Sequence, residues 1–454
     1  MIKLALTAGL FAGLPGAAVA EDEKRTDGIP TPSIATSLPQ NGDPAGARAA
    51  LAKIGVTGAV NYTGEVLGNS SGGVKRSGTY FGLLEVATTV DFEKLAGWKG
   101  LTFFANAYQI HGHGLSANNL GPNLHTVSDI EATPATRLDE MWFEQKWNDD
   151  KASLKFGTLD TTTEFFVTET GLPTIGSTFG WPSIFASALP AGGPSYPLTS
   201  VGARLKLEMN DHLTTLFAVY NGDPAGSRCK GDPQLCNDHG LEFRLGDSTF
   251  AIAEFQYKYN QDKSANALPG VIKLGGWKHF GTFADQRFDT TGVQLASPGS
   301  NGIARRLKGD YALYAILNQR VFDGRGSEAV NVFARFSTMP SDRNLIDSYF
   351  DAGVSFTGFV PKRPDDSFIA AFAYSPISSR ARGADQDQVA AGNQTIVRDY
   401  EALIELTYIA KIVPGLTLQP DFQYVFHPGG RIDDGTGKPI GDAAIWALRT
   451  IVNY

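Results

Sequence analysis

The sequence has few charged residues, only two cysteines and no excess of positive charge. Asp, Glu, Lys and Arg make up 19% of the 454 residues, and the formal net charge is −8. No basic stripe runs along the chain, so nucleic acid is not an expected partner. After the first twenty residues no run of 18 apolar residues occurs, so no membrane-spanning helix is expected.

Motifs that carry catalysis or nucleotide binding are also missing from fitting contexts. No GxSxG, HExxH, P-loop or GxGxxG segment stands where such chemistry needs it. Carboxylate pairs such as Asp139 and Glu140 leave a glycosidase as an alternative, but they fall on segments that alternate as strands do. We therefore expect neither enzymatic activity nor a cofactor.

The two cysteines, Cys229 and Cys236, lie in a polar, turn-rich segment with six residues between them. A structural metal site needs more ligands than two thiols and the nearby His239, and a redox motif needs a shorter spacing. The expected state is a disulfide that staples a loop, and no metal site is predicted.

The first twenty residues differ from the rest of the chain. Lys3 is followed by a mostly apolar stretch and by Ala18-Val19-Ala20, which predicts a secretory signal peptide cleaved after Ala20. A buried N-terminal helix is the alternative. Export implies an oxidising compartment, which agrees with a disulfide. Residues 21–54 are interpreted as a periplasmic leader with a short helix, capped by Asp43 with Pro44 at its first position. Whether this segment plugs a pore is left open.

Alternation of apolar and polar residues runs along almost the whole of residues 55–454. Val201 and Leu205 fall on one face of their segment, for example, while Arg204 and Lys206 fall on the other. Many such segments have the 9–11 residues that a transmembrane strand needs, with two or three charges on the polar face. Aromatic residues reach 11%. The pattern predicts an all-β transmembrane barrel, with a soluble β-sandwich as the alternative.

Seventeen segments alternate, but an exported barrel should have an even number of strands. Long and short connections also alternate along the chain, but around residues 240–282 the order of long and short is displaced by one connection. Assigning residues 241–247 to the cysteine-bearing loop restores the order. The prediction is therefore a 16-stranded antiparallel barrel with strands at 55–67, 79–91, 100–112, 137–147, 152–160, 200–209, 212–220, 249–260, 270–282, 310–322, 329–338, 349–358, 367–376, 399–411, 416–427 and 443–454.

The chain ends in an alternating segment whose last residue is aromatic. Trp446, Leu448, Val452 and Tyr454 share one face, while Arg449 lies on the other. Such an ending is typical of outer-membrane barrels, in which the last strand closes against the first and its aromatic residue reaches the interfacial girdle.

The connection at residues 161–198 is unusually apolar for a loop. Loops normally lie in water and are polar, yet residues 180–198 include Trp181, Ile184, Phe185 and Leu189. A sixteen-stranded barrel encloses an aqueous channel. We expect this segment to fold into the lumen and narrow it, with a lid on the outer rim or a contact with a neighbouring subunit as the alternative.

Six segments together carry a resemblance to the carbohydrate-selective porins of Gram-negative outer membranes. The resemblance covers nearly the whole mature chain, and it implies a sixteen-stranded, usually trimeric barrel that passes glucose and other sugars by diffusion. Sugars, outer-membrane lipid and a homo-trimer are then the expected partners, and a general porin without sugar preference is the alternative. The segments are "GLLEVATTVDFEKLAGWKGLTFF" (82–104), "RLDEMWFEQKW" (137–147), "TFGWPSIFASALPAGGPSYPLTSVGARL" (178–205), "VYNGDPAG" (219–226), "EALIELTYIAKIVPGLTLQPDFQYVFHPGG" (401–430) and "ALRTIVNY" (447–454).

Alternation also predicts which side chains line the channel. Sugar hydroxyls favour charged and amide partners, and the C–H faces of a sugar ring favour an aromatic surface. Each candidate has a structural alternative, because charged pairs can simply hold the loop in place and a Trp can belong to the girdle or pack under the loop. The predicted lining residues are Glu85, Glu140, Trp142, Glu144, Arg204, Lys206 and Arg335 on the strands, together with Trp181 at the start of the constriction stretch.

Overall fold

Sixteen antiparallel strands pair in sequence order, and the last strand pairs with the first, so the sheet closes into a barrel. This computed structural model describes residues 27–261, 267–324, 326–394 and 396–454. The predicted signal peptide, residues 1–20, lies outside them. The strands are β1 (Val56–Ser71), β2 (Gly78–Asp91), β3 (Leu101–Gly112), β4 (Ala135–Trp147), β5 (Ala152–Leu159), β6 (Ser200–Glu208), β7 (Leu213–Asn221), β8 (Thr249–Tyr259), β9 (Gly270–Asp289), β10 (Ala304–Asp323), β11 (Ala329–Thr338), β12 (Ser348–Thr357), β13 (Ser367–Pro376), β14 (Tyr400–Val413), β15 (Leu416–Phe426) and β16 (Ala443–Asn453).

The helices are short and lie between the strands or at the N-terminal end. No helix in the described part of the chain is long and apolar enough to cross a bilayer. The α-helices are α1 (Ala47–Lys53), α2 (Phe92–Ala96), α3 (Ser183–Ala188), α4 (Pro233–Cys236), α5 (Ser379–Ala390) and α6 (Pro428–Arg431), and the remaining helical turns are η1 (Ile34–Ser37), η2 (Pro39–Gly42), η3 (Ser116–Leu120), η4 (Thr161–Thr163), η5 (Ser177–Phe179) and η6 (Pro190–Gly192).

The outer surface of the barrel is apolar and its interior is polar. Leu313 and Trp446 point outward and are 62% and 61% exposed, whereas Arg335 and Glu405 point inward and are buried. This distribution of apolar and polar side chains is the reverse of that in a soluble protein. It arises because successive side chains of each strand point alternately to the lipid and to the polar lumen. The predicted barrel is confirmed.

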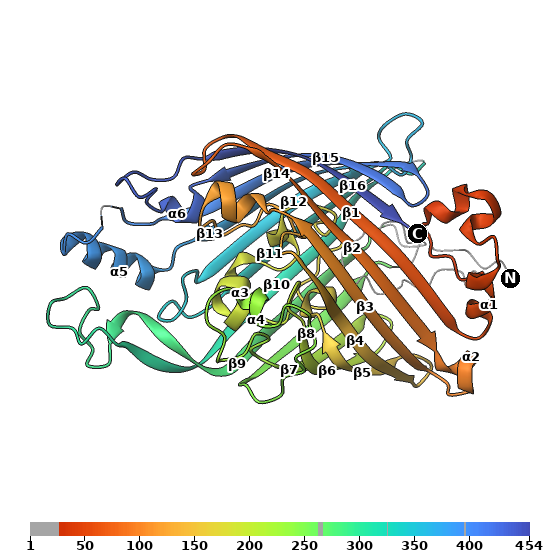
Figure 1. Cartoon of the computed structure of the whole chain (residues 1–454), viewed down its shortest axis with the longest axis horizontal. Helices are drawn as coiled ribbons and strands as arrows, with labels where there is room; N and C mark the ends of the chain where they lie inside the picture. The colour runs from red at the N-terminus through yellow and green to blue at the C-terminus, as the bar shows by residue number, and fades with distance from the viewer. Residues whose placement is uncertain (1–26, 262–266, 325, 395) are drawn as a thin grey trace.

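The two ends of the barrel differ, as expected for an outer-membrane barrel. Short turns connect the strands at the end that carries α1 and the C-terminus, and longer loops connect them at the other end (Figure 1). The short-turn end is therefore periplasmic and the long-loop end is external. Residues 241–247 lie in the external loop between β7 and β8, which confirms sixteen strands rather than seventeen.

β9 and β10 exceed their predicted limits by more than any other strand. β9 and β10 extend to Asp289 and back to Ala304, so they form a hairpin that reaches beyond the barrel at its external end (Figure 1). Their predicted limits at residues 282 and 310 mark where the apolar face stops. Backbone pairing continues through the polar residues beyond those limits, because ladder hydrogen bonds do not require an apolar face.

The N-terminal segment packs against the periplasmic rim. α1 begins at Ala47 with Gly46 as its N-cap, so the predicted start at Pro44 is wrong. Asp43 still contacts the helix, because its Oδ2 accepts a hydrogen bond from the backbone N–H of Ala49 at 3.1 Å. The C-terminal Tyr454 donates its hydroxyl to the carbonyl of Gly42 at 2.6 Å, so this segment also holds the end of β16.

The cysteines form the predicted disulfide. Cys229 and Cys236 are joined in the external loop between β7 and β8. The same loop contacts the external end of β4, where the backbone N–H of Leu138 donates to the carbonyl of His239 at 2.9 Å. The disulfide therefore restrains a loop that packs on the barrel rim.

Candidate functional site

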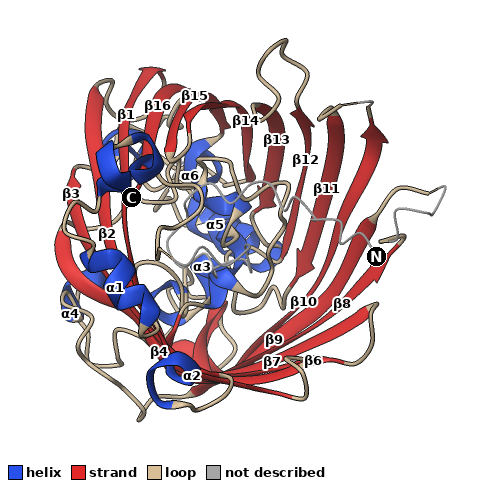
Figure 2. Ribbon diagram, turned by 90° about the vertical axis from the view of Figure 1, so that its right-hand side faces the viewer, coloured by secondary structure: helices blue, strands red, loops and turns tan. Residues whose placement is uncertain are grey.

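The connection between β5 and β6, residues 160–199, folds into the barrel, as its apolar sequence predicted. Figure 2, viewed along the barrel from the periplasmic end, shows α3 inside the ring of strands. Ile184 and Phe185 of α3 are fully buried. We call residues 160–199 the constriction loop.

Aromatic packing fixes the constriction loop against the wall formed by β8, β9 and β10. Phe185 lies with its ring centroid 5.7 Å from that of Trp277, and Phe166 lies 5.0 Å from Tyr314. Both pairs are edge-to-face, an arrangement that aromatic rings favour. The apolar side chains of the loop are therefore removed from water by aromatic residues that point into the lumen.

Arg335 on β11 is the main polar anchor of the constriction loop. Its guanidinium donates to the carbonyls of Phe166 at 2.9 Å and Thr178 at 3.0 Å, and also to Gly180. It is paired with Asp351 on β12, and neither side chain is exposed. The prediction that Arg335 lines the channel is therefore wrong, because the loop that it holds covers it completely.

Carboxylates and an amide on other strands hold the loop in the same way. Glu405 accepts from the backbone N–H groups of Ile175 at 2.5 Å and Gly176 at 2.9 Å. Glu254 accepts from Phe166 N–H at 2.9 Å, and Gln419 donates to the carbonyl of Pro173 at 2.8 Å. A loop buried in a barrel needs such partners, because its backbone groups cannot reach bulk water.

A second loop also folds inward, and the sequence did not predict it. Residues 113–134, between β3 and β4, pack beside the constriction loop, and the carbonyl of Thr126 accepts from the backbone N–H of Ser177 at 3.0 Å. Glu401 accepts from the backbone N–H of His125 at 2.6 Å, and Arg449 is paired with Asp129. The two loops together leave an open space on one side of the lumen.

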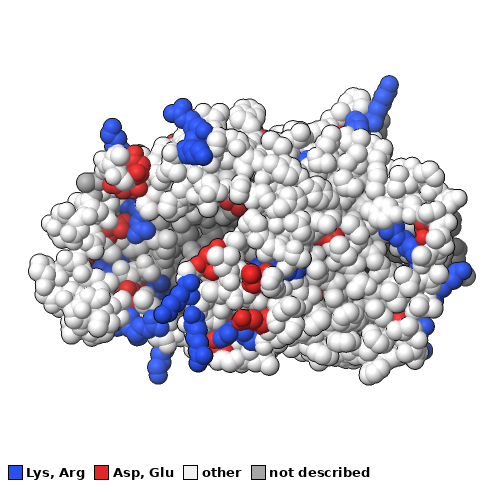
Figure 3. All heavy atoms as spheres, viewed as in Figure 1, with Lys and Arg blue, Asp and Glu red and all other residues white. Residues whose placement is uncertain are grey.

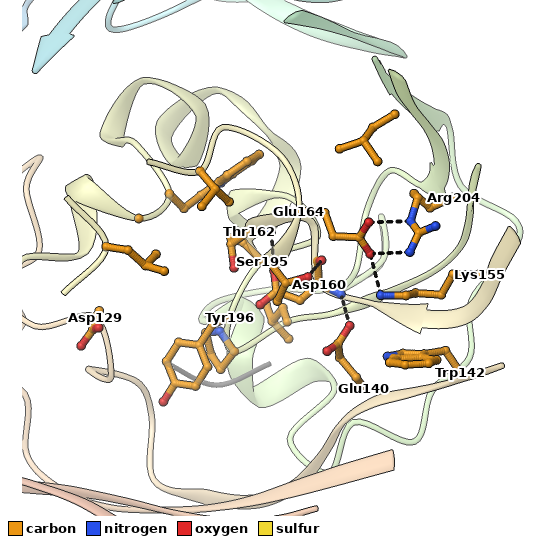
Figure 4. Close-up of a pocket in the computed structure, with 18 of the residues that line it drawn as sticks. Asp129, Glu140, Trp142, Lys155, Asp160, Thr162, Glu164, Ser195, Tyr196 and Arg204 are labelled. Atoms are coloured by element: carbon orange, nitrogen blue, oxygen red, sulfur yellow. Dashed lines mark hydrogen bonds and ion pairs between the residues drawn. The ribbon is translucent and has the colours of Figure 1, made fainter. Parts of the chain in front are cut away.

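That open space is a cavity of about 1150 Å³ between the constriction loop and the wall formed by β4, β5 and β6. Figure 4 shows part of its lining, in which Trp142, Lys155 and Arg204 of these strands face Asp160, Glu164 and Ser195 of the constriction loop, with Asp129 of the second inward loop nearby. The predicted residues Glu140, Trp142, Glu144, Trp181, Arg204 and Lys206 are among those that line it.

A cluster of four charged residues joins the loop to the wall of the cavity. Glu164 of the loop pairs with Lys155 at 2.5 Å and with Arg204 at 2.5 Å. Arg204 also pairs with Glu144 at 2.8 Å. Burial opposes ionisation of Glu164, but the charges of Lys155 and Arg204 outweigh burial and lower the pKa of Glu164 to about 2. The four side chains therefore form a ladder of alternating charges, and Figure 4 shows three of them, Lys155, Glu164 and Arg204.

Trp142 lies beside this cluster, and its ring is partly covered. Phe104 stacks with it at a centroid distance of 5.0 Å, and Lys155 Nζ lies 4.4 Å from its ring centroid. The second contact is a cation–π interaction, and it positions Lys155 between Trp142 and Glu164. Trp142 therefore contributes to the cavity wall while it also orients Lys155.

Glu140 lies deeper than regular alternation places it. The β3–β4 pairing shifts register between Ala105 and Ala107, and this irregularity turns both Asp139 and Glu140 away from solvent. Glu140 accepts a hydrogen bond from the backbone N–H of Asp160 at 3.0 Å. It therefore fixes the start of the constriction loop as well as lining the cavity.

The remaining predicted residues differ in their surroundings. Trp181 donates its indole N–H to the carbonyl of Gly192 at 2.9 Å, which braces the loop. Lys206 pairs with Glu208 at 2.8 Å, and both side chains are more than a third exposed. Glu85 lies outside the cavity, because it is buried and accepts from Asn106 at 2.8 Å and Asn61 at 2.9 Å. The prediction of Glu85 as a lining residue is therefore wrong.

Lys155 and Glu164 are lining residues that the sequence reasoning missed. Lys155 alternates with the outward-facing Leu154 and Phe156, so the pattern that nominated Arg204 could also have nominated it. Glu164 lies in the loop, where no periodic signal exists. Among the described residues, no group of three His, Cys, Asp or Glu side chains is arranged to hold a metal ion.

A closed sixteen-stranded barrel with an apolar outer belt and a polar lumen narrowed by an inward loop defines a porin of the outer membrane. The chain belongs to the carbohydrate-selective porins of the OprB family, whose family model matches residues 75–454. It is therefore a channel for carbohydrates in the cell outer membrane.

Relatives of known sequence and structure agree with this assignment. The chain is 24% identical to Porin B of Pseudomonas aeruginosa over 410 residues, which cover 86% of this chain and 87% of the relative. The high-pH structure of Pseudomonas putida OprB superposes with a TM-score of 0.80 at 19% identity, covering 91% of this chain and 97% of the other. Its low-pH structure gives a TM-score of 0.53 at 16% identity, with the same coverage. The structural likeness concerns the fold.

Proposed function

We propose that the channel passes glucose and related neutral sugars, and that these sugars bind weakly in the cavity beside the constriction loop. The observation that carries the proposal is the charged ladder of Lys155, Glu164, Arg204 and Glu144. Its members are held by one another, so they present donors and acceptors in fixed positions. Preordered partners bind a ligand without first losing their own conformational freedom.

The chemistry of this ladder suits a neutral, hydroxyl-rich solute. Opposite charges alternate along it, so the ladder itself offers strong hydrogen-bonding groups of both signs and has no net charge. Each hydroxyl can both donate to a carboxylate and accept from a cation. Lys206 and Glu208 repeat the pairing of opposite charges nearer the periplasmic mouth, with both side chains reachable by solvent. A sugar can therefore exchange water for protein partners in steps along the wall.

Weak binding is a requirement of such a channel rather than a defect. A channel conducts only when a solute leaves its site as readily as it enters. The ladder residues already satisfy one another, so a departing sugar leaves no charge without a partner. This arrangement favours selectivity through modest affinity.

We also infer that the chain assembles as a homo-trimer, the state implied by its family. The subunit contact would use part of the apolar outer surface, which is otherwise in contact with lipid. Mass determination of the detergent-solubilised protein tests this inference, and a monomer at all protein concentrations would contradict it.

Liposome swelling with a panel of neutral monosaccharides, disaccharides and charged solutes of matched size tests the proposed selectivity. We expect glucose and related monosaccharides to enter faster than charged solutes of equal size. Rates that follow size alone, whatever the charge or stereochemistry, would support a general porin and overturn the proposed sugar preference.

A further inference from the structure

Three cations lie on the outer face of the barrel, where a protein in a bilayer meets lipid. Lys278 is on β9, and Arg306 and Lys308 are on β10. On β9, Lys273 and His279 point inward, since Lys273 Nζ donates to the carbonyl of Val167 at 2.7 Å and the His279 ring contacts the carbonyl of Gly222 at 3.0 Å. Strand alternation therefore places Lys278 outward.

A register irregularity turns the other two cations outward as well. The pairing of β9 with β10 shifts between Lys308 and Asp310, and Gly309 between them has a positive φ of 70°. Lys308 is opposite Thr282 and Arg306 is opposite Ala284, both on the outward face of β9. A Cβ at Gly309 would lie 3.9 Å from Lys278 Cε, so the Lys278 side chain runs along this part of β10.

These cations mark the external edge of the apolar belt. Outward residues immediately below them are strongly exposed and apolar, including Leu274 at 55% and Leu313 at 62%. Lys278 is opposite Tyr311, and its Nζ lies 5.3 Å from the ring centroid of Phe280. Above them the β9–β10 hairpin continues into polar surroundings, and Figure 3 shows Lys and Arg side chains gathered over this hairpin. The group therefore lies at the depth of lipid headgroups in the outer leaflet.

Neighbouring carboxylates do not neutralise this group. Asp285 is paired with Arg305 at 2.6 Å, and Asp342 is paired with Arg343 at 2.8 Å. On the opposite side of the barrel the outward residues Tyr80 and His111 have rings that contact each other, and the exposed Lys75 and Arg76 lie in the turn between β1 and β2. Lys278, Arg306 and Lys308 differ from that pair because they lie on the strands themselves, beside the apolar belt.

We infer that Lys278, Arg306 and Lys308 form a binding surface for a phosphorylated lipid of the outer leaflet. The apolar belt accepts the acyl chains, while the three cations meet the phosphate groups at the height where acyl chains end. Basic residues at a membrane surface are attracted to anionic headgroups, and a guanidinium can bind a phosphate through two parallel hydrogen bonds. Outside the headgroup region, uncompensated lipid-facing cations are unfavourable.

Native mass spectrometry of the protein in non-ionic detergent tests this surface with three probes. The probes are bis-phosphorylated lipid A, the same lipid without phosphates, and its deacylated phosphorylated disaccharide. We compare the wild-type chain with K278Q/R306Q/K308Q and with K94Q/K99Q/K151Q, which removes three exposed lysines from the periplasmic turns. Resistance to unfolding in detergent shows that each variant is folded.

The inference predicts that bis-phosphorylated lipid A binds the K278Q/R306Q/K308Q variant about a hundredfold more weakly than wild type, and that the periplasmic control keeps the wild-type affinity. It also predicts that loss of the phosphates or of the acyl chains weakens binding to the wild-type chain. Equal affinity in the two triple variants would overturn the proposal. Binding of the deacylated disaccharide as tight as that of lipid A would also overturn the proposal, because it indicates a site for free phosphate. A changed oligomeric mass of the K278Q/R306Q/K308Q variant would overturn it too, because it indicates a subunit interface.

Discussion

Replacing Arg335 by methionine should release the constriction loop from the far wall of the barrel. Methionine keeps an unbranched side chain but lacks the guanidinium, so it removes the contacts with the carbonyls of Phe166, Thr178 and Gly180. It also leaves the buried carboxylate of Asp351 without its charged partner. Removing one member of a buried ion pair costs about 3–5 kcal/mol. The loop should therefore be open about 10²- to 5 × 10³-fold more often than in wild type.

Chymotrypsin cleavage measures this opening, because Phe166, Phe179 and Phe185 are fully buried in the closed loop. When the loop opens and closes faster than it is cut, the cleavage rate follows the population of the open form. The matched control is R320M, whose pair with Asp323 is 39% and 48% exposed. An exposed pair contributes about 0–1 kcal/mol. Equal cleavage rates for R335M and R320M would refute the assignment of Arg335 as the loop anchor.

Three further changes test other parts of the account. Trp142→Ala should weaken current block by glucose about two- to tenfold with little change in ion conductance; an equal effect on both currents would assign Trp142 to structure alone. Reduction of Cys229–Cys236 should leave the barrel folded, because the disulfide restrains only an external loop, and loss of β-sheet circular dichroism would contradict this. Burial lowers the pKa of His125 to about 4, because the folded loop disfavours the charged ring. The full stability of the inward loop is therefore present above pH 6.5, the ordinary pKa of histidine, and about 3 kcal/mol of it is lost as the pH falls from 6.5 through 4. An NMR titration of His125 with a midpoint near its ordinary pKa would show that the ring is not buried.

The barrel could be predicted from the sequence because its main signal is local. Inward and outward residues alternate within each strand, so segments such as 201–208 reveal their two faces without reference to neighbours. The inward path of the constriction loop was also predictable, because an apolar segment including Trp181 and Phe185 has no favourable place in water. Connection lengths resolved the strand number, since the two ends of such a barrel differ.

The roles of single residues inside the barrel were less predictable, because they depend on contacts between distant segments. Arg335 and Glu85 alternate inward as expected, yet both are covered by other parts of the chain. The irregularity that buries Glu140 beside Asp139 arises from pairing between β3 and β4, and alternation within one strand does not contain it. The second inward loop was missed because residues 113–134 are largely polar and resemble an ordinary external loop.

The sequence nevertheless carried a signal for several loop anchors. Glu401 and Glu405 stand on the polar face of a strand that is otherwise apolar, and both bind backbone N–H groups of inward loops. A carboxylate in a water-filled lumen and one that holds a buried loop look alike in a sequence. Only the partner distinguishes them, and the partners here are more than 200 residues away.

The most direct test of the central claim is the current through single channels in a planar bilayer as glucose is added. A sugar that binds beside the charged ladder of Lys155, Glu164, Arg204 and Glu144 interrupts the ion current while it is bound. We expect a block that deepens and saturates with glucose concentration. The binding site would be contradicted if glucose lowered the current only as far as it raises the viscosity of the solution. In that case a polymer that is too large to enter the channel would lower the current by the same amount at equal viscosity.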